Sequence, residues 1–406
     1  MSAAAQNINV REGQVRVGTP EFRRINIALF CAGFVTFITL YDVQPLLPLF
    51  AQEFGVSPAV ASLPLSCATI ALALGMLIAG TVSETVGRRA LMTVALFLTS
   101  LLALATLFSH SFESLLALRL LQGLVLAGVP SVAMAYLGEE MDAQAIGHAM
   151  GLYISGNALG GMSGRIGSAL FCKFVPWHTA IALVGVVSLL LSLVFLKSLP
   201  ASTNFHQRPF QFSYLYTSLF QHLRDPGLHC LYALAFLTMG GFISLYNYIG
   251  FRLLAPPYQL TQFQVSLIFL VYMLGSFSSG MVGSLIHRFG RPFMIRLTLA
   301  VMLVGTLITL SEPLPLIVAG VGIFTCGFFC AHAIASSWVG RRASTAKAQA
   351  SSLYLFSYYL GSSISGTIGG LFWQNFGWNG VAAMITLLIL SAFGVAALLL
   401  RMPTTE

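Results

Sequence analysis

Long apolar runs, each about the length of a membrane-spanning helix, alternate with short polar segments along almost the whole chain. A helix needs about 20 apolar residues to cross the hydrocarbon core of a bilayer. Glycine, proline and charged residues divide the chain into twelve such runs, at residues 25–50, 58–80, 90–109, 114–137, 147–170, 178–199, 228–252, 262–284, 293–311, 313–338, 349–372 and 379–400. The pattern predicts an all-α polytopic membrane protein with twelve transmembrane helices.

One long polar interruption, at about 201–227, separates the apolar runs into two groups of six. The expected organisation is therefore a cytoplasmic N-terminal segment, a six-helix bundle, a cytoplasmic linker, a second six-helix bundle and a short cytoplasmic tail, at residues 1–24, 25–199, 200–227, 228–401 and 402–406 respectively.

Composition supports a membrane protein and argues against a nucleic-acid-binding or metal-binding protein. Of the 406 residues, 57% are hydrophobic and 8% are charged, against roughly 25% charged in soluble domains. The net charge of +8 would suggest nucleic acid for a soluble domain, but the charges lie at the ends of apolar runs, so we expect no nucleic-acid partner. The six cysteines show no CxxC spacing, and we interpret them as packing residues rather than metal ligands. The first apolar run is too long for a signal peptide, so no cleavage is expected.

The distribution of Lys and Arg predicts the orientation. With the amino terminus inside, sixteen of the 20 basic residues fall on the cytoplasmic side: Arg11, Arg16, Arg23, Arg24, Arg88, Arg89, Lys197, Arg208, Arg224, Arg288, Arg291, Arg296, Arg341, Arg342, Lys347 and Arg401. Only Lys173 and Arg252 fall outside, and Arg119 and Arg165 lie within helices. Because basic residues concentrate on the cytoplasmic side of membrane proteins, both termini are expected there.

The two groups of helices repeat each other with an offset of 201 to 205 residues. The loop GTVSETVGRR (Gly80–Arg89) matches GSLIHRFGRP (Gly283–Pro292), and FITLYD (Phe37–Asp42) matches FISLYN (Phe242–Asn247). Parallel repeats of this kind are typical of secondary transporters, whose site lies at the repeat interface.

Asp42 is the only carboxylate clearly inside a predicted span. A charged group in hydrocarbon is costly and marks a functional site by default. Pro45 and Pro48 follow within two turns, and they predict a bend in the helix just beyond the acid.

Three segments give the whole chain a resemblance to the major facilitator superfamily, and within it to the YnfM type of bacterial inner-membrane efflux permease. They are GLYISGNALGGMSGRIG, AHAIASSWVGRRA and SSLYLFSYYLGSSISGTIGG. The resemblance implies the major facilitator fold, in which two pseudo-symmetric six-helix bundles rock about a central site. It also implies a transporter rather than an enzyme, with the proton gradient as energy source and no cofactor.

The loop between the second and third spans resembles the family signature G-x-x-x-D-R-x-G-R-R. The matching residues are Gly80, Glu84, Gly87, Arg88 and Arg89, and the second copy has Gly283, His287, Arg288, Gly290 and Arg291. The resemblance implies that these loops latch the two bundles together on the cytoplasmic face in one conformation. The carboxylates available as partners are Glu139, Glu140 and Asp142. The alternative is that Arg88 and Arg89 only fix topology.

Two further family signatures lie in the fourth and fifth spans. Arg119, Gln122 and Gly123 match R-x-x-Q-G, which the resemblance associates with a proton relay or substrate cavity. A structural bridge between helices is the alternative. The antiporter signature ends G-P-x-x-G-G, and here it reads Gly156, Asn157, Gly160 and Gly161. Loss of the proline weakens the family argument for export, while the glycines favour close helix packing.

Asp42 and Arg119 are expected at similar depth, roughly 12 and 8 Å below the outer ends of their helices, and Arg165 lies at about the depth of Arg119. We hypothesise that Asp42 is the coupling acid and faces Arg119 or Arg165; a static pair that orients helices is the alternative. Two cations against one carboxylate permit an anionic or zwitterionic substrate.

Several uncharged residues complete the candidate set. The candidates for the substrate cavity are Tyr41, Gln122, Asn157, Tyr246, Asn247, Tyr354 and Tyr358. His332 is a second titratable candidate for coupling, with a satisfied interhelical histidine as the alternative. The alternative for the tyrosines is that they pack between helices or lie in the aromatic belts at the membrane surface.

These features predict a secondary active transporter of small organic solutes that exports them by proton-coupled alternating access. The alternatives are a proton-linked importer, a uniporter, or a non-transporting sensor with the same fold. The chain has no HExxH, GxSxG or GxxxxGK[ST] motif, which argues against an enzyme or an ATP-driven pump. The expected partners are a small-molecule substrate, the proton and the lipid bilayer, and the chain is expected to act as a monomer.

Overall fold

The computed structural model describes residues 14–205, 207, 217, 219–343 and 345–402. The expected N-terminal segment, linker and tail lie partly outside these residues, so their limits stay predictions. The first half contains α1 (Pro20–Tyr41), η1 (Gln44–Leu46), α2 (Leu47–Glu53), α3 (Pro58–Ala61), α4 (Leu63–Val86), α5 (Arg88–Ala105), η2 (Thr106–Phe108), α6 (Phe112–Leu126), α7 (Pro130–Glu140), α8 (Ala143–Phe171) and α9 (Trp177–Ser198). The second half contains α11 (Pro226–Leu254), α12 (Gln262–Ser266), η3 (Leu267–Val271), α13 (Tyr272–Phe289), α14 (Arg291–Ile308), α15 (Leu314–Arg342) and α16 (Lys347–Leu399).

The described chain contains 10 helical segments that are long and apolar enough to cross a membrane. Two features account for the difference from the predicted twelve. The 53-residue α16 contains a non-helical residue, Gly377, with φ 58° and ψ −147°, so it is two spans joined at that glycine. The 29-residue α8 is long enough to span, but it is less apolar than the other spans, because it is rich in Gly and Ser and contains His148, Asn157 and Arg165. The prediction of an all-α protein with the twelve-helix fold is confirmed.

Prolines divide several runs that the apolar pattern treats as single helices. The first span breaks after Tyr41 and resumes as η1 and α2, as predicted from Pro45 and Pro48. The fourth span, predicted at 114–137, also breaks, between α6 and α7 just before Pro130. Proline lacks the amide that continues a helix, and its ring disfavours the helical conformation in the preceding residue. The predicted fourth span is therefore present, but it consists of two helices.

Side-chain caps define where three of the long helices begin. The hydroxyl of Thr19 accepts from the amide of Phe22 at 3.2 Å, and a carboxylate oxygen of Asp142 accepts from the amide of Ala145 at 2.7 Å. Asp225 caps α11 in the same way. Each cap satisfies amides that a helix start leaves without intrahelical partners.

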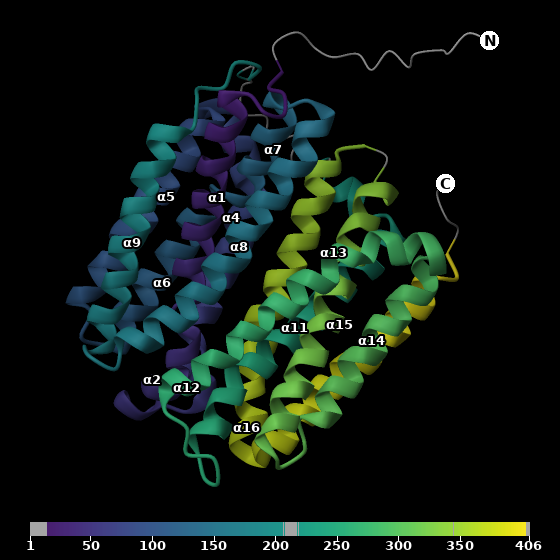
Figure 1. The fold of residues 1–406 in the computed structure, drawn as a ribbon. Coiled ribbons are helices and arrows are strands. Elements are labelled where there is room, and N and C mark those ends of the chain that lie inside the picture. Colours follow the sequence, from purple (N-terminus) through teal and green to yellow (C-terminus); the bar gives the residue numbers. More distant parts are fainter. Residues whose placement is uncertain (1–13, 206, 208–216, 218, 344, 403–406) are drawn as a thin grey trace.

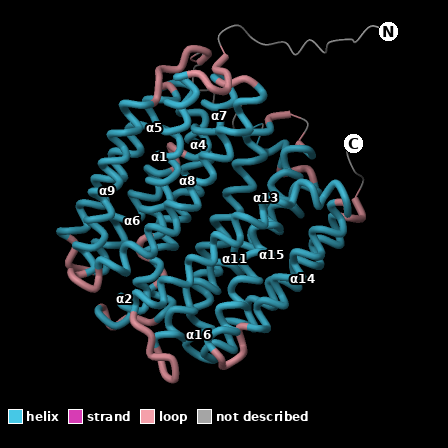
Figure 2. The backbone as a smooth tube through the Cα atoms, in the orientation of Figure 1, coloured by secondary structure: helices cyan, strands magenta, loops and turns pink. Residues whose placement is uncertain are grey.

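The helices form two groups that lie side by side, the first half in purple to teal and the second in green to yellow (Figure 1). Nearly all of the described backbone is helical, and most connections are short loops (Figure 2). The described chain ends lie on the same side of the molecule. We call this side the termini face and the opposite side, where α2 and α12 lie, the far face.

In both halves, a glycine of one helix packs directly against the backbone of a neighbouring helix. A Cβ at Gly160 of α8 would lie 2.3 Å from the carbonyl oxygen of Phe34 in α1, and a Cβ at Gly361 of α16 would lie 2.2 Å from that of Phe236 in α11. Gly156 faces the carbonyl of Phe30 in the same way. Only glycine allows helix backbones to approach this closely.

Gly160→Ala is expected to destabilise the protein by about 1–3 kcal/mol, because the added methyl group forces α8 away from α1. Gly167→Ala is the matched control on the same helix, since a Cβ there meets nothing within 4 Å. The control should be neutral or slightly stabilising, because alanine favours a helix. Thermal unfolding in detergent compares the two, and equal melting temperatures would contradict this reading of the contact.

Hydrogen bonds between the halves gather from mid-depth to the far face. Thr69 and Ser363 hydroxyls lie 2.7 Å apart, and the Thr367 hydroxyl donates to that of Ser66 at 2.9 Å. Near the end of α1, Gln262 donates to the carbonyl of Pro45. The halves are thus held together on the side away from the chain ends.

Candidate functional site

A buried ion pair lies where α1 ends. Nη1 of Arg119, on α6, is 3.0 Å from Oδ1 of Asp42, and neither side chain is exposed at all. Because α1 stops at Tyr41, its last carbonyls have no intrahelical partners. The guanidinium of Arg119 supplies donors to two of them, the carbonyl oxygens of Thr39 and Leu40. The break that the prolines cause therefore creates the binding place for the arginine.

Gln122 and Ser168 complete the surroundings of the pair. Oε1 of Gln122 accepts from Nη1 of Arg119 at 2.6 Å, so Gln122 orients the arginine and is itself buried. The hydroxyl of Ser168, on α8, donates to the backbone carbonyl of Asp42 at 2.6 Å. The second carboxylate oxygen of Asp42, Oδ2, is buried and receives no hydrogen bond from the described residues. One oxygen of the acid is paired and the other remains available for a proton.

Arg165 has different surroundings from those expected. It does not bind Asp42; its Nε donates to Oε1 of Gln44 at 2.6 Å and its Nη1 to the carbonyl of Gly161 at 2.8 Å. Gly161 was expected to be a close-packing glycine, but a Cβ there would meet Nη1 of Arg165 at 3.0 Å. Gly161 therefore makes room for a side chain rather than for a helix backbone.

Aromatic rings surround the rest of the Arg165 guanidinium. Its carbon lies 3.9 Å from the ring centroid of Tyr41, 4.7 Å from that of Tyr272 and 5.0 Å from that of Phe269. The last two rings belong to the second half, so Arg165 lies at the boundary between the halves. Ring faces stabilise a cation when it is desolvated, but among the described residues no carboxylate pairs with this one.

Gln44 was not identified from the sequence, although it joins the two halves. Its Nε2 donates to Oδ1 of Asn247, on α11, at 2.7 Å, while its Oε1 accepts from Arg165. Asn247 is the repeat counterpart of Asp42, yet it contacts Gln44 and not the ion pair. The only signal in the sequence was the position of Gln44 in an apolar stretch two residues after Asp42, which its lack of charge made easy to pass over.

The titratable candidate of the second half lies in an aromatic cluster. Nδ1 of His332, on α15, is 3.0 Å from the hydroxyl of Tyr354, and its ring centroid is 4.9 Å from that of Tyr358. The hydroxyl of Tyr246 pairs instead with that of Thr325 at 2.7 Å. No ion pair with His332 occurs among the residues described, and the structure does not bring it together with Asp42.

Asn157 packs against α1 rather than between the halves. Its Oδ1 lies so close to Gly33 that a Cβ at that glycine would overlap it. No group of three or more His, Cys, Asp or Glu side chains within the described ranges is arranged to hold a metal ion.

The loop motif of the first half forms a compact polar cluster at the termini face. Arg88 donates to both carboxylate oxygens of Glu139, at 2.8 and 3.3 Å, and lies 3.9 Å from Glu84. Gly87 has φ 101°, a conformation that other residues rarely adopt. Arg89 donates to the carbonyl of Leu196. These contacts join elements of one half, not the two halves.

The other two carboxylates offered as partners have different roles. Glu140 accepts from the hydroxyl of Thr203 at 2.7 Å and from the amide of Asn204 at 3.0 Å, so it binds the start of the linker. Asp142 caps α8. Neither pairs with an arginine of the motif. Glu140 is the last residue of α7 and Asp142 is the N-cap of α8, and both carboxylates are engaged in these other contacts.

In the second half an ion pair joins the start of α11 to the end of α15. Nη2 of Arg342 is 2.9 Å from Oδ1 of Asp225. Burial acts to raise the pKa of the Asp225 carboxyl, but the hydrogen bonds from Arg342 and from the amide of Gly227 outweigh it, so this pKa lies below its ordinary value. The second loop motif lies nearby, where Gly290 has φ 77° and Arg291 begins α14.

Known proteins similar to this chain are membrane transporters. The family model described as Major Facilitator Superfamily matches residues 26–331. The uncharacterised MFS-type transporter YybF of Bacillus subtilis is 48% identical over 95% of this chain and 96% of its own length. The inner membrane transport protein YnfM of Escherichia coli is 46% identical over 98% of this chain and 95% of its own.

A solved structure has the same fold. A bacterial homologue of the human lysosomal transporter Spinster, in an inward-facing and occupied conformation, matches with a TM-score of 0.73 and 13% identity, covering 94% of this chain and 97% of that one. With the family match and the two close relatives, this establishes that the chain belongs to the major facilitator superfamily of membrane transporters.

Proposed function

We propose that this transporter exports small organic solutes in exchange for protons, and that Asp42 is the residue that binds the proton. The observation that carries the proposal is the Asp42–Arg119 pair, which is fully buried in the middle of a membrane-spanning bundle. Intramembrane carboxylates are costly and occur chiefly along ion and proton pathways.

The contacts of the pair suit a residue that gains and loses a proton. Oδ2 of Asp42 has no partner among the described residues, so a proton can bind there without displacing a hydrogen bond. When Asp42 becomes neutral, Arg119 retains the carbonyls of Thr39 and Leu40 and the amide oxygen of Gln122. Protonation therefore weakens the link between α1 and α6 without leaving the arginine unsatisfied.

Arg165 supports an anionic or zwitterionic substrate. It carries a charge that no described carboxylate neutralises, and Tyr41, Tyr272 and Phe269 surround it at the boundary between the halves. A carboxylate or similar group of a solute would take the place of Gln44 at the guanidinium, and the rings would contact the apolar part. Charge-assisted hydrogen bonds of this type are stronger than neutral ones.

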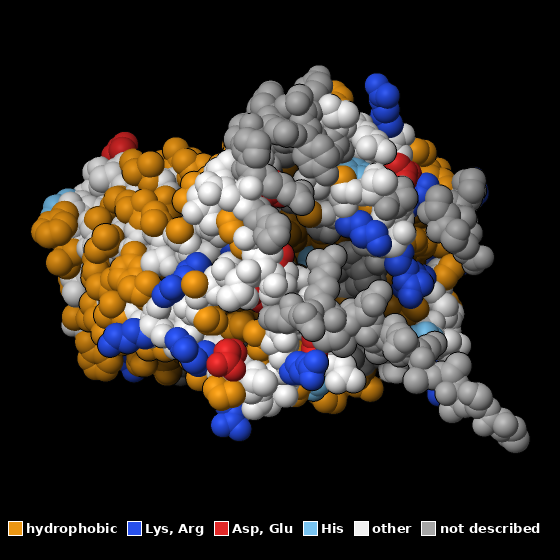
Figure 3. Space-filling view, turned by 90° about the horizontal axis from the view of Figure 1, so that it is seen from above, with side chains coloured by type: hydrophobic (Ala, Val, Ile, Leu, Met, Phe, Trp, Pro, Cys, Tyr) orange, Lys and Arg blue, Asp and Glu red, His pale blue; other side chains and the backbone are white. Residues whose placement is uncertain are grey.

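The contacts between the halves suit alternating access. They gather from mid-depth to the far face, and the Gln44–Asn247 bond is among them. We infer that this conformation is closed to the outside and that the termini face is cytoplasmic. Lys and Arg side chains, in blue, outnumber acidic ones, in red, on the visible part of that face (Figure 3). This agrees with the usual excess of basic residues on the cytoplasmic side of membrane proteins. The proposed location is a bacterial inner membrane.

Transport in sealed proteoliposomes tests the function. A panel of organic anions, zwitterions and neutral analogues is added to vesicles that contain a pH-sensitive dye and have an acidic lumen. Exchange for protons predicts alkalinisation of the lumen when a substrate is added. Acidification on substrate addition to vesicles without a gradient would indicate proton-linked import instead. Substrate uptake with no proton movement would contradict coupling.

Arg165→Gln is expected to raise the KM for an anionic substrate on the order of 10- to 100-fold, since a charge-assisted hydrogen bond contributes about 1.5–3 kcal/mol. The KM for a neutral analogue should rise much less. Lys173→Gln removes the same charge from an exposed site near the far face and is the control. An equal loss for anionic and neutral solutes, measured as initial uptake rates, would argue against Arg165 as the anion contact.

A further inference from the structure

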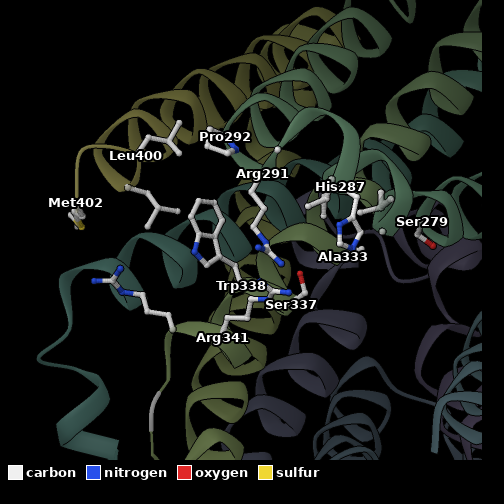
Figure 4. Close-up of a pocket in the computed structure, with 16 residues that line it drawn as sticks. Ser279, His287, Arg291, Pro292, Ala333, Ser337, Trp338, Arg341, Leu400 and Met402 are labelled. Carbon is white, nitrogen blue, oxygen red and sulfur yellow. The ribbon is translucent and has the colours of Figure 1, made fainter. Parts of the chain in front are cut away.

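A cavity of about 800 Å³ opens in the second half at the termini face. It lies between α13, α14, α15 and the end of α16, and Figure 4 shows its lining. The basic side chains of His287, Arg291 and Arg341 contribute to it, beside the indole of Trp338. In Figure 4 the guanidinium groups of Arg291 and Arg341 extend toward the same part of the cavity, next to Ser337.

The internal repeat shows that this place differs chemically from its counterpart. In the first half, Arg88 is held by Glu139 and lies near Glu84. The corresponding residues of the second half are Arg291 for Arg88, Arg341 for Glu139 and His287 for Glu84. Both carboxylates of the first-half cluster are therefore replaced by basic residues.

The replaced charges are not compensated by carboxylates of the described chain. Neither Arg291 nor Arg341 forms an ion pair with a described residue, whereas Arg342 on the same wall is paired with Asp225. Nε of Arg291 is buried and has no hydrogen-bond partner in the described part of the chain. The amino end of α14 lies at Gly290 and has no side-chain cap, and helix amino termini attract anions. The cavity thus offers donors and positive charge to an anion.

Much of the rest of the wall is apolar, although the hydroxyl-bearing Ser279 and Ser337 also line it. The side chains of Val282, Ile286, Leu399, Leu400 and Met402 line it together with Trp338. An apolar wall beside a basic cluster suits a molecule with an anionic head and a hydrocarbon part. Basic pockets between membrane helices bind phosphate-containing lipid head groups in this way.

We propose that this cavity binds a phosphate group, which takes the place that Glu139 occupies in the first half. The phosphate lies between Arg291 and Arg341 and ties the loop before α14 to the end of α15. Its source is either the head group of an anionic phospholipid or free inorganic phosphate. The site is separate from the Asp42–Arg119 pair and does not depend on the proposed transport reaction.

Thermal unfolding of the purified protein in a neutral detergent tests the site. Two probes are compared, inorganic phosphate and phosphatidylglycerol, with phosphatidylcholine as the zwitterionic reference. A ligand that binds only the folded state raises the melting temperature in a concentration-dependent manner. A response to phosphatidylglycerol alone assigns a lipid head group, and a response to both assigns a general phosphate site. No response to either probe overturns the proposal.

Two variants locate the response. Arg291→Gln is expected to weaken the apparent affinity for the responding probe on the order of tenfold, because a charge-assisted pair is lost. Arg296→Gln removes the same charge from an exposed position on the same helix, outside this cavity, and should respond like the wild type. An equal loss of apparent affinity in the two variants overturns the proposal.

Arg341→Glu separates binding from folding. It rebuilds the arrangement of the first half, with a carboxylate opposite Arg291, so it is expected to fold and to melt at or above the wild-type temperature without added anion. It should also lose the response to the probe. A variant that still responds as strongly as the wild type would show that the anion binds elsewhere.

Discussion

Asp42→Asn is expected to abolish proton-coupled transport while the protein still folds. The asparagine side chain is almost the same size, and its carbonyl oxygen can still accept from Arg119, but it cannot take up a proton. A coupling free energy of about 1–3 kcal/mol between two ligands corresponds to a 5- to 150-fold effect, so the pH gradient should lose a stimulation of this order. The measurement is the initial rate of substrate uptake into proteoliposomes with and without a pH gradient.

Counterflow of labelled substrate provides the control for this variant, because exchange of substrate for substrate needs no net proton transfer. Asp42→Asn should retain counterflow while it loses the response to the pH gradient. Glu53→Gln is a matched acid-to-amide change, since Glu53 accepts from the indole of Trp177 and lies away from the ion pair. Full gradient-driven transport by Asp42→Asn would eliminate Asp42 as the coupling acid.

Arg119→Leu is expected to destabilise the protein by about 3–5 kcal/mol, the range observed when one partner of a buried ion pair is removed. The change leaves a carboxylate that is 0% exposed without a counter-charge and also removes donors from the carbonyls of Thr39 and Leu40. The midpoint of thermal or denaturant unfolding in detergent measures the loss.

A double-mutant cycle separates the two parts of that loss. In the Asp42→Asn background Arg119→Leu leaves no carboxylate without a counter-charge, so it should cost less than it does in the wild type. The cost that remains belongs to the carbonyls at the end of α1. If Arg119→Leu costs the same in both backgrounds, the two residues are not energetically coupled, and the ion pair would have no part in stability.

Local sequence pattern was sufficient for the membrane spans and for the bend beyond Asp42, but the break of the fourth span before Pro130 was not predicted. Membrane spans need long apolar runs, and Pro45 and Pro48 cannot continue a regular helix, so both features depend on neighbouring residues alone. The estimated depths placed Asp42 and Arg119 at similar levels. They did not distinguish Arg119 from Arg165 as the partner, because depth along an axis does not define the direction in which a side chain points.

The sequence by itself determined the membrane fold, the internal repeat and the presence of one acid and two arginines within the spans. Only the tertiary structure decided that Arg119 binds Asp42 and the end of α1, while Arg165 lies among aromatic rings and reaches Asn247 through Gln44. It also decided that Gly161 makes room for Arg165. These contacts join residues far apart in the chain, and they depend on how each helix is rotated and tilted against its neighbours. Packing of the whole bundle sets those angles.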